Sequence, residues 1–315
     1  MEKKNIKQII IGVGIFVLAI TSTIISFSNL SDTAKVSDES SSWMKNISDD
    51  EYISNISIPG THDSGALYSI ADVAGKCQDL SIKKQLESGA RFLDIRLIYT
   101  NSGFKVIHGM VDERQDFSNV LKVCKEFLSK NNSETIIMSI KKEADGKDGF
   151  SAALEKLIAD NGDLFYTARS IPQLKDVRGK IILFSRYSEN NLGLDASHNW
   201  LSPSKESVTN TFEIVNGEEK IHVQDYFEFS NLEDKWNEVT NCLSYTSSKT
   251  DAKILSINFL SGVQDGGFPP SYSVPVAKYI NTKFISYKDS FTKSGTVLFD
   301  FITEEMAKIV YSKNF

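Results

Sequence analysis

The chain has 315 residues, of which 41% are hydrophobic, so it is long enough to bury one large core or two smaller ones. It carries 41 acidic and 35 basic residues, a formal net charge of -6. This balance argues against a nucleic-acid-binding protein, which usually presents a net basic face to phosphates, and against attachment to lipid by charge attraction alone.

The first segment has the order of an export signal. Lysines precede an apolar run over residues 9–27, and a serine-rich polar stretch follows it. The run is nearly as long as the roughly 20 residues that a spanning helix needs. We therefore expect residues 1–28 to be a cleaved signal peptide, with a retained membrane anchor as the alternative, and residues 29–42 to be a polar linker. The expected location is secreted (extracellular), with attachment through the uncleaved segment as the alternative.

The three cysteines give no indication of a metal or redox centre. No two of Cys77, Cys124 and Cys242 have the spacing of zinc ligands or of a CxxC pair. We expect buried thiols, with one disulfide as the alternative in an exported protein.

Past residue 42 strand-like and helix-like segments alternate, without a low-complexity tract or a long linker, so residues 43–315 are predicted to form a single domain. Strands are expected at 53–58, 92–98, 104–107, 135–140, 180–184, 221–223, 253–259 and 296–299. Helices are expected at 116–131, 150–159, 232–243, 274–284 and 303–311.

This alternation predicts an α/β fold with mostly parallel strands, and about eight strands favour a barrel over an open sheet. The connection at 99–103 is too short to hold a helix. The predicted fold is therefore an irregular, incomplete (β/α)8 TIM-type barrel.

Ionisable residues lie at the ends of most predicted strands. In a parallel barrel the loops at the carboxyl ends of the strands surround one mouth. Any one such residue would more commonly be a helix cap or a solvated surface group. Their recurrence at seven strands indicates a functional site. The residues are His62, Asp63, Arg96, His108, Lys141, Arg186, Asp225 and Asp300.

The types of residue in this set indicate phosphoryl chemistry. Two histidines allow one to act as a general base and the other as a general acid near neutral pH. Arg96 is always charged and forked, so it suits the non-bridging oxygens of a phosphoryl group. Without a cluster of carboxylates, this set fits metal-free phosphoryl transfer from a substrate with a nearby hydroxyl.

Two segments resemble signatures of bacterial phosphatidylinositol-specific phospholipase C. They are residues 56–65, ISIPGTHDSG, and residues 89–96, GARFLDIR. The similarity spans residues 43–315, in the order of the family. Further similar segments are 107–109, 133–143, 177–183, 223–225 and 300–302. The resemblance implies an incomplete barrel that cleaves phosphatidylinositol without a metal or other cofactor, giving diacylglycerol and inositol 1,2-cyclic phosphate.

The resemblance also implies roles for the acid and base groups. His62 resembles the base that takes the proton from the inositol 2-hydroxyl, and Asp300 resembles the carboxylate that orients it. His108, coupled to Asp63, resembles the acid that protonates the departing diacylglycerol oxygen.

Arg96 resembles the residue that holds the phosphate, in the place where calcium sits in metal-dependent relatives. Asp94 resembles a carboxylate that supports this arginine. No metal site is implied.

For the inositol ring, the resemblance implies that Lys141, Arg186 and Asp225 bind the hydroxyls. Two residues beyond this aspartate the family has a tyrosine against the ring. Here Phe227 stands there, with Tyr226 beside it. A phenylalanine can stack on the ring but offers no hydroxyl.

The implied partner is a membrane surface that contains phosphatidylinositol, and no obligate protein partner is implied. Family members insert aromatic side chains of mouth loops into lipid. The loop over 67–79 has Tyr68 but no tryptophan, and Phe268 and Tyr272 are candidates for the same contact. Free phosphatidylinositol and the glycosylated anchor of surface proteins are both open as the substrate.

Three alternatives stay open. One is a calcium-dependent phospholipase C of the same fold, which would need oxygen ligands where Arg96 stands. Another is a glycerophosphodiesterase-like or sphingomyelinase D-like barrel with a metal held by carboxylates. The third is a catalytically inactive lipid-binding barrel.

Overall fold

The computed structural model describes residues 38–68, 75–187, 192–201, 203, 207, 209–265 and 273–315. The predicted signal peptide, most of the predicted linker, and Phe268 and Tyr272 lie outside the described residues. The chain divides into two compact units, of which the second runs from Val36 to Phe315. Within the described ranges, no helix combines the length and the apolar character needed to cross a membrane.

The second unit is built on a sheet of parallel strands, in the order β6-β7-β5-β2-β1-β14-β12-β10-β9. In this spatial order every pair of adjacent strands between β6 and β10 is parallel. At the far edge β9 (Thr211–Asn216) pairs antiparallel with β10. The parallel strands are β1 (Ile58–Thr61), β2 (Phe92–Thr100), β5 (Ile136–Lys142), β6 (Phe165–Tyr166), β7 (Ile181–Arg186), β10 (Glu219–Gln224), β12 (Ile254–Phe259) and β14 (Thr296–Phe299). In the described part of the chain the two ends of this order do not pair, so the sheet is not closed.

Strands β3 (Gly103–His108) and β4 (Val111–Asp116) form an antiparallel hairpin attached to β2. The short connection after β2 is therefore a turn rather than a crossover helix, as the sequence predicted. Strands that the sequence did not indicate are β4, β6, β9, and the short β8 (Leu194–Asp195), β11 (Glu228–Phe229) and β13 (Val263–Gln264).

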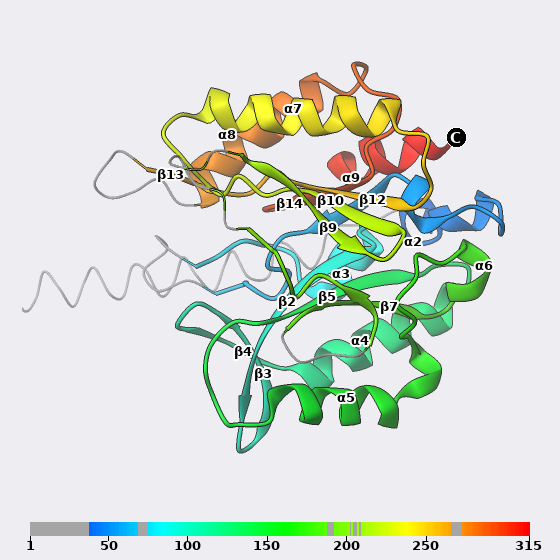
Figure 1. The fold of residues 1–315 in the computed structure, drawn as a ribbon, viewed down its shortest axis with the longest axis vertical. Coiled ribbons are helices and arrows are strands. Elements are labelled where there is room, and N and C mark those ends of the chain that lie inside the picture. Colours follow the sequence, from blue (N-terminus) through cyan, green and yellow to red (C-terminus); the bar gives the residue numbers. More distant parts are fainter. Residues whose placement is uncertain are drawn as a thin grey trace, which may run out of the picture. The chain divides into compact units, whose positions relative to one another are not determined.

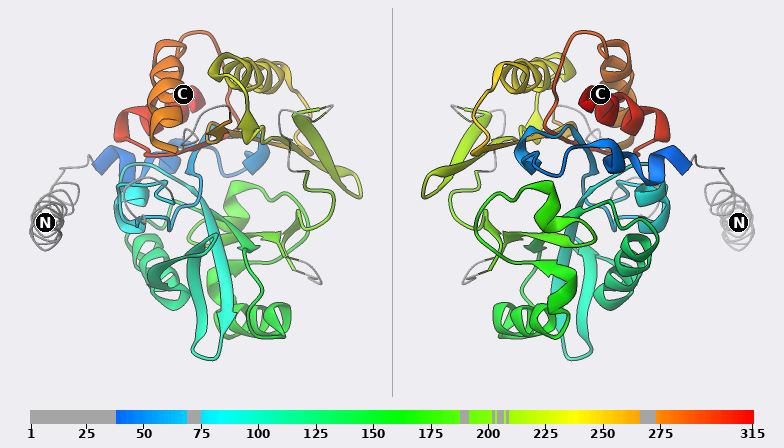
Figure 2. Two further views of the ribbon diagram at one scale, coloured as in Figure 1. Left: turned by 90° about the vertical axis from the view of Figure 1, so that its left-hand side faces the viewer. Right: turned by 90° about the vertical axis from the view of Figure 1, so that its right-hand side faces the viewer.

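Helices cover the outer side of the sheet (Figure 2). They are α2 (Asp38–Ser41), α3 (Ile82–Glu87), α4 (Phe117–Lys130), α5 (Phe150–Asp160), α6 (Leu174–Val177), α7 (Leu232–Ser248), α8 (Ser273–Ser286) and α9 (Glu304–Tyr311). In Figure 1, α7 and α8 lie on the opposite side of the strands from α4 and α5. The five predicted helices are all present, with boundaries within a few residues except at the end of α7.

Successive side chains of a strand point to opposite faces of the sheet. In the central strands both faces are buried. Phe92 packs in a core with α7, α8 and α9, whereas its neighbour Leu93 packs in a second core with α4 and α5. This accounts for the continuous apolar runs by which the sequence revealed these strands.

The strand expected over residues 53–58 is wrong in extent. Only Ile58 belongs to β1, and Ile53–Asn55 form a short 3-10 helix. The Ile53 N–H donates to the Pro172 carbonyl at 3.1 Å, and the Ile53 side chain is fully buried. The apolar run here reflects burial of its side chains in the hydrophobic core rather than pairing in a strand.

The packed domain also begins earlier than the sequence predicted. Residues 38–42, assigned to the polar linker, include α2, whose Ser40 is fully buried. The Ser40 hydroxyl donates to Glu304 at 2.7 Å and also contacts the Tyr311 hydroxyl. Hydrogen bonds rather than apolar side chains hold this segment, so hydropathy did not reveal it.

A buried ion pair fastens the amino-terminal segment to the sheet. Arg91 and Glu134 are both fully buried, with 2.9 Å between Arg91 Nη2 and Glu134 Oε2. The Arg91 guanidinium also donates to the Ser41 carbonyl, and Glu134 accepts from the Met44 N–H. The guanidinium carbon lies 4.6 Å from the centre of the Phe127 ring.

Replacing Arg91 by methionine should lower the free energy of unfolding by about 3–5 kcal/mol, because it leaves a buried carboxylate without its partner. Urea denaturation of the purified domain measures this loss. Lys175→Met removes an exposed ion pair with Asp50 and should leave the urea concentration at the midpoint of unfolding nearly unchanged. Equal midpoints for Arg91→Met and the parent protein would contradict the assignment.

Candidate active site

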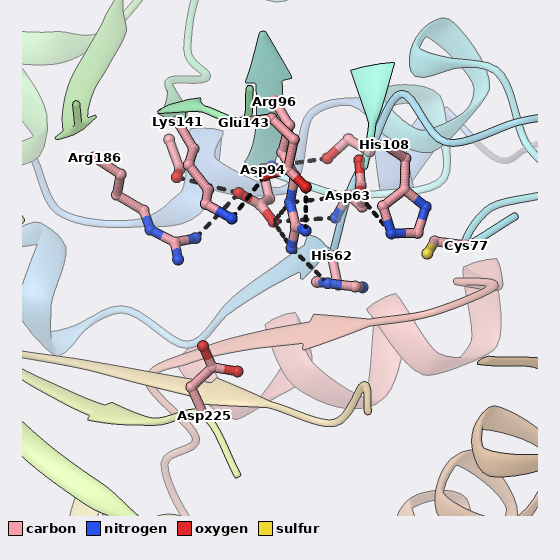
Figure 3. A network of polar contacts seen from close by, with 12 residues as sticks. His62, Asp63, Cys77, Asp94, Arg96, His108, Lys141, Glu143, Arg186 and Asp225 are labelled. Carbon is pink, nitrogen blue, oxygen red and sulfur yellow. Dashed lines mark hydrogen bonds and ion pairs between the residues drawn. The ribbon is translucent and has the colours of Figure 1, made fainter. Parts of the chain in front are cut away.

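The carboxyl ends of the strands surround a cavity of about 480 Å³. The structure brings most of the site residues expected from the sequence to this cavity. Figure 3 labels ten polar side chains in its wall and directly behind it. The predicted residues that line it are His62, Arg96, His108, Lys141, Arg186, Asp225, Phe227 and Asp300. Asp63 and Asp94 lie directly behind them, because each is fully buried and contacts Arg96.

His62 lies between a carboxylate and a guanidinium. Its Nδ1 is 2.8 Å from Asp300 Oδ1, and its Nε2 is 2.7 Å from Arg96 Nη2. A guanidinium can only donate, so Nε2 accepts and the ring proton lies on Nδ1, where it is donated to Asp300. Nε2 therefore carries the lone pair, on the side that lines the cavity.

The electrostatic setting of His62 suits a base. Burial alone would lower its pKa, and so would Arg96, but attraction by the Asp300 carboxylate and the hydrogen bond to it outweigh both, so the pKa is raised. A raised pKa makes the imidazole a stronger proton acceptor.

Arg96, on β2, is held by three carboxylates. Its nitrogens lie 3.2 Å from Asp94 Oδ2, 3.4 Å from Asp63 Oδ2 and 3.5 Å from Glu143 Oε1. Burial opposes the charge, but these carboxylates outweigh it and raise the pKa of Arg96 well above its usual value. Arg96 therefore carries a fixed positive charge at the wall of the cavity.

Asp94 connects this arginine to the ring-binding side. It accepts from Ser139 at 3.3 Å and lies 3.4 Å from Arg186 Nη1. Burial alone would raise its pKa, but Arg96 and Arg186 lower it far below the usual value. Asp94 is thus a permanent anion that fixes the positions of two guanidinium groups.

The second histidine pairs with Asp63. His108 Nε2 is 3.4 Å from Asp63 Oδ2, and His108 Nδ1 donates to the Gly75 carbonyl at 2.5 Å. Burial raises the pKa of Asp63, although Arg96 and His108 act in the opposite direction. The backbone of Asp63 has a φ of 40°, a strained conformation for a non-glycine residue next to the end of β1.

The ring-binding candidates meet two residues that the sequence did not single out. Glu143 Oε2 pairs with Lys141 Nζ at 2.6 Å. Trp200 lies under Arg186, 3.6 Å from guanidinium carbon to ring centre, and its Nε1 donates to Asp225 at 3.1 Å. Glu143 could have been found from the sequence, because it is an acidic residue just past the end of a predicted strand. Trp200 lies in a loop, where no such pattern identifies it.

The two neighbouring aromatics point to different places. Phe227 lines the cavity and is 39% exposed, as a ring that stacks on substrate requires. Tyr226 is 6% exposed and packs against Phe229 in the core. The structure therefore does not bring Tyr226 to the described wall of the cavity.

Two histidine–carboxylate pairs around a guanidinium, at the mouth of an open parallel barrel, define an enzyme that cleaves phosphodiesters. Residues 56–187 match the family model described as phosphatidylinositol-specific phospholipase C, X domain. A 1-phosphatidylinositol phosphodiesterase of Staphylococcus aureus is 31% identical over 297 residues, which cover 89% of this chain and 87% of that protein. The chain belongs to the phosphatidylinositol-specific phospholipase C family of enzymes.

Other relatives agree along nearly the whole chain. A 1-phosphatidylinositol phosphodiesterase of Listeria monocytogenes is 28% identical over 303 residues, 92% of this chain and 90% of that protein. A solved structure of the S. aureus phospholipase superposes with a TM-score of 0.78 at 27% identity, covering 88% of this chain and 98% of that one. The L. monocytogenes structure gives 0.71 at 26% identity, with 88% and 99% covered. The predicted fold class, an irregular and incomplete barrel, is confirmed.

Proposed function

We propose that this enzyme cleaves phosphatidylinositol at the phosphate–glycerol bond without a metal ion, giving diacylglycerol and inositol 1,2-cyclic phosphate. The observation that carries the proposal is the arrangement of His62 and His108 around Arg96, each with its own carboxylate. The names of the relatives, 1-phosphatidylinositol phosphodiesterase, support the choice of substrate.

In the first half of the reaction the lone pair on His62 Nε2 takes the proton of the inositol 2-hydroxyl. The hydroxyl oxygen then attacks phosphorus, and the phosphate takes the place of His62 as the acceptor of the Arg96 Nη2 proton. Arg96 stabilises the charge that grows on the non-bridging oxygens, because its donors are already fixed by carboxylates.

In the second half the bond from phosphorus to the glycerol oxygen breaks, and His108 Nε2 gives its proton to that oxygen. The Nδ1 hydrogen bond to Gly75 and the Asp63 carboxylate hold this imidazole in place. Hydrolysis of the cyclic product follows with the two roles exchanged, because water must lose a proton to His108 while His62 returns one.

For ring recognition, we place Phe227 against the inositol face and Lys141, Arg186 and Asp225 at its hydroxyls. All four line the same cavity. Trp200 keeps Arg186 and Asp225 in position from behind.

The enzyme is further proposed to act outside the cell, at a membrane surface that contains phosphatidylinositol. The basic, apolar and polar order of the first residues supports export. Tyr68 is 43% exposed and suits contact with an interface. Membrane binding of the S. aureus relative, and its modulation, are the subject of that enzyme's solved structure, which supports a similar contact here.

Cleavage should proceed at an unchanged rate in excess EDTA, because the Arg96 guanidinium supplies the positive charge that calcium supplies in metal-dependent phospholipases. Phosphorus NMR of phosphatidylinositol micelles with purified enzyme follows the cyclic phosphate directly. Loss of the signal in EDTA and its return with calcium would overturn the metal-free reaction. Binding to the micelles without any new phosphorus signal would instead identify an inactive lipid-binding barrel.

A further inference from the structure

Cys77 lies in the wall of the cavity, between the two histidine–carboxylate pairs, and the proposed reaction does not use it. Its side chain is 2% exposed. The Cys77 sulfur belongs to two groups of metal-ligand atoms that lie within 4.8 Å of one another, one with His62 and Asp300 and the other with Asp63 and His108. Figure 3 shows the sulfur beside the His108 ring.

The first of these groups is unsuited to a cation. Both ring nitrogens of His62 are engaged, Nδ1 by Asp300 and Nε2 by Arg96. The Arg96 guanidinium, 2.7 Å from Nε2, stands where a cation bound to that nitrogen would have to be.

The second group has the features of a metal site. The Nδ1 proton of His108 is donated to the Gly75 carbonyl, which leaves Nε2 directed toward Asp63 and Cys77, where a bound ion would displace the Nε2 proton. Histidine ligands of metals are commonly fixed in this way, through a hydrogen bond from the other ring nitrogen.

The Asp63 carboxylate supports a cation in this group independently of the histidine. It is fully buried, and within the described residues neither of its carboxylate oxygens accepts a hydrogen bond. Its ion-pair partners Arg96 and His108 both stand at 3.4 Å. A buried carboxylate whose oxygens accept no hydrogen bond is unusual, and its lone pairs can bind a further electrophile.

We propose that Asp63, Cys77 and His108 bind Zn²⁺, and that this cation reversibly inhibits the enzyme. One nitrogen, one sulfur and one oxygen ligand suit zinc, with the fourth position open to the cavity. The thiol and His108 Nε2 each release a proton to solvent when their bonds to zinc form, and thiolate plus carboxylate then balance the charge of the ion. Calcium and magnesium prefer oxygen ligands and should not compete.

Inhibition, unlike binding, rests on the proposed function. Zinc on His108 Nε2 takes the place of the proton that this histidine gives to the glycerol oxygen. The binding step itself depends only on the three ligands.

The test uses the purified chain with Co²⁺ alone as a spectroscopic probe, followed by displacement with Zn²⁺ in a thiol-free reductant. The parent protein should show a thiolate-to-cobalt charge-transfer band and tetrahedral ligand-field bands at one equivalent. Cys77→Ser should lose the charge-transfer band. Cys242→Ser, which changes an equally buried thiol elsewhere, should retain it.

Cleavage is measured in the same samples, with each variant scaled to its own rate in EDTA. Zinc should inhibit the parent and Cys242→Ser alike, and Cys77→Ser should need about tenfold more zinc or higher. If circular dichroism shows that Cys77→Ser is unfolded, His108→Gln replaces it in the binding assay and should lose the tetrahedral bands.

Absence of the charge-transfer band in the parent, or its persistence in Cys77→Ser, would overturn the zinc site. A band that needs Cys77 without any inhibition would overturn the inhibitory role, and with it the assignment of His108 as the acid. If the enzyme proves to be inactive on phosphatidylinositol while the band still needs Cys77, the proposed function fails and the zinc site stands.

Discussion

Replacing His62 by alanine should lower kcat for phosphatidylinositol cleavage by about 10²–10⁴-fold, and replacing His108 should do the same. Without His62 the inositol hydroxyl loses its proton acceptor, and Asp300, which contacts the far nitrogen of this ring, lies farther from the substrate. Without His108 the glycerol oxygen must leave as an alkoxide. Initial rates on phosphatidylinositol micelles measure both effects.

His222→Ala is the matched control, because this histidine is also largely buried, stacks on Tyr245 and does not line the cavity. It should keep the parent rate, and circular dichroism should show all three variants folded. The pH profile gives a second readout: the rate should fall on the acid side as His62 becomes protonated, and Asp300→Asn should move this fall to lower pH, because Asp300 raises the pKa of His62. A His62→Ala enzyme with half the parent rate would contradict its role as the base.

Arg96→Lys should lower kcat by about 10²–10³-fold, the usual effect of losing one fixed donor to a developing oxyanion. The guanidinium contacts Asp94 and His62 through Nη2 and Asp63 through Nε at the same time. A lysine ammonium is a single point charge and cannot keep these contacts while it holds two phosphate oxygens. The same micelle assay, with kcat and KM determined separately, measures the loss.

Arg169→Lys provides the control for this change. Arg169 is half exposed and pairs with Asp195 away from the catalytic cavity, so its replacement should leave kcat unchanged. An Arg96→Lys enzyme as fast as the parent would show that the phosphate is held by another group, of which Lys141 and Arg186 are the nearest candidates.

The sequence by itself determined the class of fold and the residues around the mouth of the barrel. Buried parallel strands leave continuous apolar runs, so β2, β5 and β12 could be located within two residues. Parallel strands also bring their carboxyl ends to one edge, so the polar residue after each run predicted a common site. The order of the matching segments then indicated the family.

The tertiary structure alone decided which of these residues touch. The ring of His62 reaches Asp300 across 238 residues of chain, and the register of β1 against β14 makes that pair possible. Adjacent residues point to opposite sides, so only the structure separates Phe227 at the cavity from Tyr226 in the core.

The sequence did not predict some of the loop residues that line the cavity. Trp200 and Cys77 follow no strand and belong to no periodic pattern, yet both line the cavity. Their positions depend on packing between segments far apart in the chain, which leaves no local signal in the sequence. Hydropathy reports how deeply a residue is buried, whereas the contacts of an active site depend on how distant strands and loops come together.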